Sequence, residues 1–163
     1  MRLTTRGRYA VTAMLDLALQ PDSQPVSLSE IAQRQTISVA YLEQLFAKLK
    51  RHGLVTSLRG ANGGYRLGRS PDQIAVLDII EAVNESVDTR RCEGRGDCHH
   101  GSKCLTHELW HDLSEQISGY LRQVTLASVI ERRSSLVPAD AEPVAIRPRS
   151  SVSEAHSLEN FLQ

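Results

Sequence analysis

Apolar residues recur at the helical spacing in three stretches before Gly53. The first stretch stops at Pro21, and its apolar positions are Val11, Met14, Leu15, Ala18 and Leu19. In the second, Ser27 and Glu30 have capping-box spacing, which predicts a short helix over about residues 28–35. The third ends at Gly53, a good C-terminal cap, and its apolar positions are Leu42, Leu45, Phe46 and Leu49. These patterns predict three helices, with a tight turn at residues 36–37.

The period changes to two residues after Gly53, where one set of positions alternates with another: Leu54, Thr56 and Leu58 against Val55, Ser57 and Arg59. A second short segment, residues 65–67, follows a glycine-rich stretch. Together they predict a β-hairpin, and we expect Asn62, Gly63 and Gly64 to supply the positive φ angles of its tip. Three helices followed by a hairpin is the order of a winged helix-turn-helix. The expected fold is therefore mainly α (α+β), with this winged domain over residues 1–70.

The pattern after Pro71 predicts a short amphipathic helix, then a polar loop over residues 85–102. A long helix is expected from about Lys103, with apolar residues at every fourth position: Leu105, Leu109, Leu113, Ile117 and Leu121. This stripe is longer than a small winged domain can cover, so we expect it to form the interface of a two-fold homodimer. Burial of the stripe against residues 1–83 of the same chain is the alternative.

Thr125 is expected to cap a last short helix that continues to Ile130. Residues 71–133 would thus form a second unit, consisting of the polar loop and the dimerisation helices. Residues 134–163 contain Pro138, Pro143 and Pro148 among small and charged residues, a composition typical of a disordered C-terminal tail.

The formal net charge of zero hides an uneven distribution along the chain. Residues 1–70 carry ten Lys/Arg and four Asp/Glu, whereas residues 71–163 carry nine and fifteen, so the two parts have net charges of +6 and −6. A basic first part favours binding to a phosphate backbone, although chance asymmetry of a solvated surface would give the same count. No apolar run approaches a membrane span, so we expect a cytoplasmic protein with no membrane partner.

The exposed face of the third predicted helix is polar, as expected for a helix that enters the major groove of double-stranded DNA. Its early residues would meet base edges, with Gln44 able to pair with adenine and Glu43 with cytosine. Later basic residues suit phosphates, and Arg59 before the hairpin tip suits a narrow minor groove. The expected DNA contacts are Arg2, Arg8, Ser38, Ala40, Tyr41, Glu43, Gln44, Lys48, Arg51 and Arg59.

Two other functions compete with DNA binding. Three helices and a hairpin could form a protein-binding module whose basic residues are merely solvated. Residues 59–64 could be a nucleotide phosphate loop, but they join two predicted strands and lack the Lys-Ser/Thr ending of such loops. The chain also offers no convincing set of nucleophile, base and orienting residue, so we do not expect an enzyme, and no catalytic residue is assigned.

Cys92, Cys98 and Cys104 are separated by five residues each, and His107 follows three residues after Cys104. Soft thiolates with one imidazole suit an iron-sulfur cluster, zinc or a cuprous ion. Structural zinc sites usually contain closely spaced cysteine pairs, so the wide spacing favours a larger [2Fe-2S] cluster. We expect Cys104 and His107 to share one helix face, which favours His107 as fourth ligand over His99, His100 and His111. A zinc-stabilised DNA-binding protein and three unligated thiols remain the alternatives.

Several short segments closely resemble the family of winged-helix iron-sulfur repressors. They are residues 1–4, 7–10, 41–45, 59–60 and 63–65, together with the cysteine-histidine spacing, and the resemblance covers about residues 1–133. It implies a homodimer that binds a [2Fe-2S] cluster through the three cysteines and His107. It also implies repression of the genes for cluster assembly, its own operon among them, and activation at other promoters, with the assembly machinery as cluster donor. By this resemblance Tyr41, Glu43 and Gln44 read bases and Arg59 enters the minor groove, whereas relatives often carry Ser in place of Ala40.

Overall fold

The first three helices of the computed structural model form a compact unit around a shared core; the structure describes residues 4–21, 24–60, 63–90 and 92–136. Helix α1 spans Thr5–Ala18, α2 spans Leu28–Gln35 and α3 spans Val39–Arg51. The capping box at Ser27 and Glu30 is present, and Thr36 ends α2 in the left-handed conformation with a φ of 56°. The predicted bounds of α2, residues 28–35, follow from local capping and are confirmed.

Helix α3 buries the face that its sequence pattern predicted, namely Leu42, Leu45, Phe46 and Leu49. Helix α1 behaves differently, because Met14 lies in the core while Val11 and Leu15 are only partly buried. Its most buried apolar residues are instead Ala10, Ala13, Met14 and Leu17. The physical reason is that α1 has neighbours on two sides: Val11 packs against both hydrophobic clusters of the molecule. Small residues on the inner face allow this close packing.

The predicted hairpin is formed by β1, Val55–Leu58, and β2, Gly64–Leu67, which pair antiparallel with Val55 opposite Leu67. Its tip differs from the expectation: the positive φ of +115° lies at Gly60, and Gly63 and Gly64 do not have positive φ, while Asn62 lies outside the described residues. Glycine is needed at position 64 for space, because a Cβ there would lie 2.6 Å from the backbone carbonyl of Val26. Val26 bonds to Tyr65 through both backbone groups, at 2.9 and 2.8 Å.

The second half of the chain begins with a short 3-10 turn, Pro71–Gln73, followed by α4, Val76–Ala82. After the loop come α5, His107–Gln123, and α6, Leu126–Leu136. Helix α5 therefore begins at His107, four residues later than expected, so Cys104 precedes the helix instead of sharing a face with His107. Helix α6 continues past Ile130 to Leu136, which places residues 134–136 in a helix; residues 137–163 lie outside the described residues.

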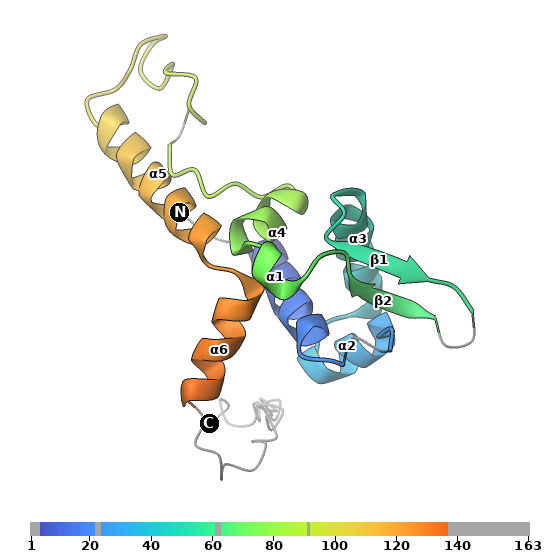
Figure 1. Cartoon of the computed structure of the whole chain (residues 1–163). Coiled ribbons are helices and arrows are strands. Elements are labelled where there is room, and N and C mark those ends of the chain that lie inside the picture. The colour runs from blue at the N-terminus through green and yellow to red at the C-terminus, as the bar shows by residue number, and fades with distance from the viewer. Residues whose placement is uncertain (1–3, 22–23, 61–62, 91, 137–163) are drawn as a thin grey trace, which may run out of the picture.

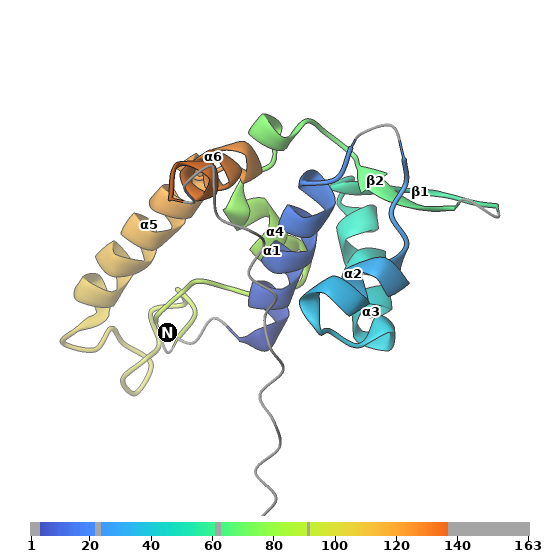
Figure 2. The same ribbon diagram turned by 90° about the horizontal axis from the view of Figure 1, so that it is seen from below.

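The two halves share one core. Ile74, Ile79, Val83 and Leu126 belong to the same buried cluster as the residues of α1 and α3. Backbone bonds from Leu126 N to Ile74 O, 3.0 Å, and from Val76 N to Val124 O, 2.8 Å, hold the start of α6 beside the start of α4. Figure 2 shows α1 and α4 between two groups of elements: α2, α3 and the hairpin on one side, and α5 and α6 on the other.

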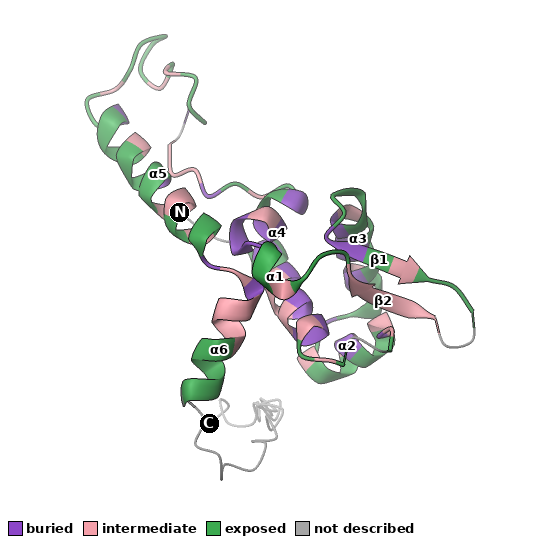
Figure 3. Cartoon of the chain, in the orientation of Figure 1, coloured by how far each residue is buried: buried purple, intermediate pink, exposed green. Residues whose placement is uncertain are grey.

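Helix α5 projects away from this core (Figure 1), and most of its length is exposed in Figure 3. Leu105 before the helix is fully exposed, and Leu109, Trp110, Leu113 and Tyr120 are also exposed. Only the last part of the apolar stripe, Ile117 and Leu121, packs against the second hydrophobic cluster. Among the described residues, none of the helices has the length and apolar character needed to cross a lipid bilayer.

Gly64→Ala is expected to lower the free energy of unfolding by about 1–3 kcal/mol, because the new methyl group would be forced against the Val26 backbone. Gly119→Ala is the matched control: Gly119 lies inside α5 with nothing within 4 Å of its Cβ position, so alanine should stabilise by about 0.5–1 kcal/mol. Urea unfolding at a fixed protein concentration measures both. Equal stability of the two variants would contradict the steric role of Gly64.

Candidate metal centre and DNA-binding surface

The segment between α4 and α5 carries the cysteines and is attached to the fold at its beginning. Val87 is buried in the second hydrophobic cluster. Two residues later, Thr89 donates its backbone N–H to Ser114 Oγ of α5 at 2.9 Å, and its hydroxyl donates to the carbonyl of Trp110 at 3.0 Å. The chain then turns through Gly94 and Gly96, whose φ angles of +85° and +75° suit glycine. This path brings the cysteine segment to the N-terminal end of α5.

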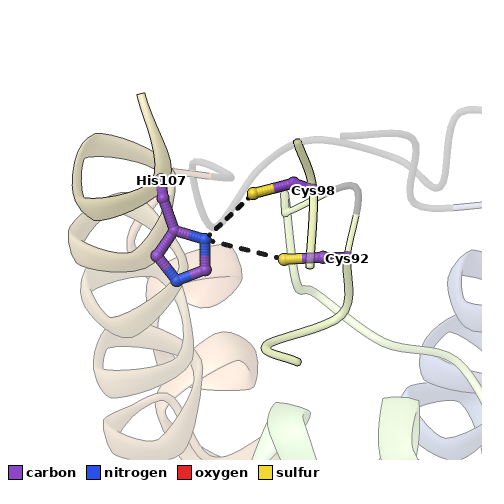
Figure 4. Close-up of side chains that lie close together, drawn as sticks. All are labelled: Cys92, Cys98 and His107. Carbon is purple, nitrogen blue, oxygen red and sulfur yellow. Dashed lines mark hydrogen bonds between the residues drawn. The ribbon is translucent and has the colours of Figure 1, made fainter. Parts of the chain in front are cut away.

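Cys92, Cys98 and His107 lie together at that end (Figure 4). His107 Nδ1 is 3.6 Å from Cys92 Sγ and 3.4 Å from Cys98 Sγ, and the three donor atoms lie within 4.8 Å of one another. Cys92 and His107 are buried, and Cys98 is half-buried. Two thiols and one imidazole from opposite ends of the segment therefore converge on one point.

Cys104 borders the same site but lies outside this group of three. Its backbone N–H donates to Cys98 Sγ at 3.1 Å, and its own Sγ is 3.7 Å from Thr106 Oγ1. All three cysteines and His107 line one cavity of about 270 Å³, which also includes Arg90 and Trp110. None of the three cysteines forms a disulfide. The fourth donor is thus at the wall of a cavity large enough for a group bigger than a single ion.

The surroundings of two of the thiols favour thiolate, the form that binds metals. Burial raises the pKa of Cys92, but backbone N–H groups of Gly96 and Gly94 outweigh it, so the pKa lies below its ordinary value. The side chains of Cys98 and Thr106 lower the pKa of Cys104. The pKa of Cys98 is raised: the Cys104 backbone N–H lowers it, but burial and the two neighbouring thiols outweigh that contribution.

The other histidines named as rival ligands lie elsewhere. His99 and His100 are exposed and pack edge-to-face against each other, with ring centroids 4.8 Å apart. His111 is one turn further along α5, where its Nδ1 lies 2.9 Å from Arg90 Nη1. Of the four histidines considered, His107 alone lies in the described group with Cys92 and Cys98.

The predicted recognition helix presents a free polar face. Ala40, Glu43, Gln44 and Arg51 are exposed on α3, and Ser38 caps its N-terminus by accepting the backbone N–H of Tyr41 at 3.3 Å. Tyr41 is half-buried and lies edge-to-face on Tyr9 of α1, with ring centroids 6.0 Å apart. Tyr9 thus supports a base-reading candidate, a role that its place in the α1 pattern did not reveal.

The basic residues expected to contact DNA differ in their exposure. Arg8 and Arg59 are exposed, the latter directly after β1, and Arg2 lies outside the described residues. Lys48 is half-buried, and its Nζ donates to the carbonyl oxygen of Val83 at 3.3 Å, so it joins α3 to the end of α4 in this structure. Lys50 instead extends toward the hairpin, where its Nζ donates to Ser57 Oγ at 2.6 Å.

Comparison with known proteins identifies the family. The model of the family "Rrf2: Iron-dependent Transcriptional regulator" matches residues 3–132. The chain belongs to the Rrf2 family. It is 51% identical over 151 residues to the HTH-type transcriptional regulator IscR of Citrobacter koseri, covering 93% of each chain. It is 49% identical over 155 residues to IscR of Escherichia coli O9:H4, covering 95% of this chain and 96% of the relative.

Solved structures show the same Rrf2 architecture. IscR of T. potens superposes with a TM-score of 0.71 at 38% identity, covering 86% of this chain and 94% of the other. CymR, the global cysteine regulator of B. subtilis, gives a TM-score of 0.70 at 34% identity, with coverages of 81% and 98%. The predicted winged-helix fold is confirmed, and the chain is a DNA-binding transcription regulator rather than an enzyme.

A polar cluster beside the candidate metal centre was not predicted from the sequence. Asp88 accepts bonds from Arg90 Nη2 at 2.7 Å and from Ser114 Oγ at 3.2 Å. The Arg90 side chain, followed by its backbone N–H, Ser114 and the positive charge of Arg90, lowers the pKa of Asp88 to about 2 despite partial burial. No periodic pattern marks Asp88 and Arg90; the only signal was their opposite charges shortly before Cys92.

Asp88→Asn is expected to destabilise the folded chain by about 1 kcal/mol at neutral pH, a value reduced for partial solvent exposure. Because the folded-state pKa of Asp88 is depressed, its contribution is present above the unfolded value of 3.8 and is lost as pH falls toward about 2. Urea midpoints of both proteins should therefore converge as pH falls through this window.

Asp97→Asn is the control, because Asp97 forms a more exposed ion pair with Arg95 in the same loop. It should leave stability within about 0.5 kcal/mol of the wild type. A pH-independent difference for Asp88→Asn would show that the carboxylate charge is not the stabilising feature.

Proposed function

We propose that this Rrf2 regulator senses an iron-sulfur cluster of the [2Fe-2S] type, bound by Cys92, Cys98, Cys104 and His107. The observation that carries the proposal is the convergence of three cysteines and one imidazole on one cavity at the start of α5. Soft sulfur donors suit iron-sulfur clusters, and the half-open position of Cys98 and Cys104 leaves the bound group accessible for gain and loss. When bound, the cluster would supply a redox-sensitive and removable signal.

The proposed target is double-stranded DNA, bound by residues 1–70. Support comes from the exposed polar face of α3 and the net charge of +6 over these residues. Tyr41, Glu43 and Gln44, with the neighbouring Ala40, would face base edges, and Ser38, Arg8, Arg51 and Arg2 would contact the backbone. Arg59 would enter the minor groove beside the hairpin. Lys48 would reach phosphate only by leaving the Val83 carbonyl.

The proposed assembly is a homodimer formed by residues 71–133. The apolar positions Leu105, Leu109 and Leu113 are exposed in the single chain, whereas only Ile117 and Leu121 pack internally. Exposed apolar side chains on a projecting helix favour pairing with a second copy, which would present two α3 helices to a two-fold operator.

The cluster would act on DNA binding through the segment that joins α4 to α5. At the start of that segment, Glu85 accepts the backbone N–H of Gly7 on α1 at 2.9 Å, and the carbonyl of Val83 accepts from Lys48 of α3 at 3.3 Å. Ordering the segment by four ligands would therefore bias both α1 and α3. A coupling of about 1–3 kcal/mol is typical, so weak operators would respond first. Glu43 would add discrimination, because an unpaired carboxylate in the groove is unfavourable.

The proposed target genes are those for iron-sulfur cluster assembly, including the regulator's own operon. This part rests on the similarity to relatives named IscR and on the resemblance of the cysteine-histidine spacing. The assembly machinery would then be the cluster donor, so that the fraction of regulator with a bound cluster reflects how well cluster supply meets demand.

Anaerobically purified protein tests the cofactor directly. We expect a reddish-brown solution with visible charge-transfer absorption, and iron and sulfide in equal amounts. Cys92→Ala, Cys98→Ala and Cys104→Ala should each lose this absorption but keep the far-ultraviolet circular dichroism of the fold, whereas His107→Cys should retain a cluster because thiolate can replace imidazole. Colourless wild-type protein with stoichiometric zinc would contradict the proposal in favour of a structural zinc site.

Leu113→Glu is expected to give monomers at micromolar concentration, because it places charge in the proposed apolar interface. Operator affinity should fall by about 100-fold or more when the two half-sites are no longer bound together. Sedimentation and a titration of duplex DNA at fixed salt measure the two effects. Arg122→Gln, at an exposed position on a different face of α5, should change neither. A wild type that sediments as a monomer would refute the dimer.

A further inference from the structure

A permanent cation borders the cysteine cavity. Arg90 lines the cavity together with Cys92, Cys98 and His107, and its side chain is only 18% exposed. The guanidinium lies against Gly94: a Cβ at that position would be 3.1 Å from Arg90 Nη2 and 3.3 Å from Cζ. The backbone N–H of Gly94 in turn faces the Cys92 sulfur. Arg90 is thus separated from a proposed ligand by a single glycine backbone.

Three groups hold the guanidinium in this position. Asp88 accepts from Arg90 Nε at 2.9 Å and from Nη2 at 2.7 Å, a bidentate arrangement that fixes the plane of the guanidinium. His111 Nδ1 lies 2.9 Å from Nη1. Ser114 anchors Asp88 at 3.2 Å from α5. A side chain held by two residues of α5 and one of its own loop has little freedom to move away when a cluster is bound.

The ion pair is oriented across the loop. Asp88 borders a second hollow, together with Glu81, Glu85 and Glu115, and it is absent from the walls of the cysteine cavity. Arg90 borders both hollows. Of these charged groups, only the cation therefore lines the cavity that holds the sulfurs, whereas the carboxylates line the second hollow and partly offset its field.

We propose that Arg90 stabilises the reduced form of the bound cluster and thereby raises its reduction potential. This inference rests on the proposed [2Fe-2S] site. An oxidised core held by three thiolates and a neutral imidazole carries one net negative charge, and a one-electron donor makes that two without any proton transfer. A fixed cation attracts the doubly charged form more strongly than the singly charged form. Asp88, His111 and Ser114 are positioning residues for this cation.

The test compares Arg90→Gln and Arg90→Lys with the wild type, each purified with its cluster and titrated with dithionite and redox mediators. Loss of the charge in Arg90→Gln should lower the ratio of reduced to oxidised cluster at a fixed potential about tenfold, equal to about 59 mV for one electron. Arg90→Lys keeps the positive charge but loses the planar guanidinium. Its ratio of reduced to oxidised cluster should therefore stay within about threefold of the wild type.

Arg95→Gln is the matched control. Arg95 lies in the same loop with a 63% exposed side chain that pairs with Glu93 and Asp97, so its removal should leave the potential unchanged. An unchanged potential in Arg90→Gln, with a normal cluster spectrum, would overturn the role of Arg90 alone. A reduction potential of Arg90→Lys as low as that of Arg90→Gln would also overturn it. Loss of the cluster in both variants would do the same. If only Arg90→Gln loses its cluster, retention at near wild-type potential in Arg90→Lys supports the charge. Wild-type protein without a cluster would overturn the proposed function and this inference together.

Discussion

Paired backbone bonds between residues 74–76 and 124–126 fasten to one core the two ends of the stretch that contains α4, the cysteine loop and α5. Leu126 bonds to Ile74 and Val76 to Val124, and the side chain of Leu126 is fully buried beside those of α1 and α3. Without this return of the chain, α5 would be an appendage attached only through a polar loop. With it, the helix that carries His107 and the helix that carries Glu43 belong to one packed body. A shift of α5 can therefore be transmitted through the core to α3.

The candidate metal centre depends on this arrangement in a specific way. His107 is the first residue of a helix whose base is fixed to the core, whereas Cys92 and Cys98 come from a loop anchored by Val87 and Thr89. One donor is therefore placed by rigid structure and two by a segment held at one end. Such a site can be approached and emptied more easily than one enclosed by secondary structure, which suits a group that serves as a signal. Arg90, held by Asp88, adds a positive charge to the wall of the cysteine cavity.

Basic and polar residues on one side of α1 and α4 contrast with exposed apolar residues on the other side. The winged unit carries the basic residues and the free face of α3, while α5 carries exposed apolar side chains away from it (Figures 1 and 3). Acidic residues gather near the start of the loop, where Glu81, Glu85 and Glu115 line a hollow that includes none of the three cysteines. The basic and acidic parts of the sequence thus lie in different parts of the structure. The acidic part is repelled by a phosphate backbone, so only the basic winged unit is attracted to it.

Local chemistry determined much of this protein from sequence alone. The Ser27–Glu30 box set the limits of α2, the α3 stripe matched its buried face, and the family follows from segments along most of the chain. Capping and periodicity act within a few residues, so they can be read in one dimension. Other features needed the fold: the inner face of α1, which has two neighbours; the crowding of Gly64 by Val26; the start of α5 at His107; and the contact of Arg90 with the cysteine cavity. Each depends on residues far apart in the chain or on the end of an uncapped helix, and only tertiary packing brings those groups within reach of one another.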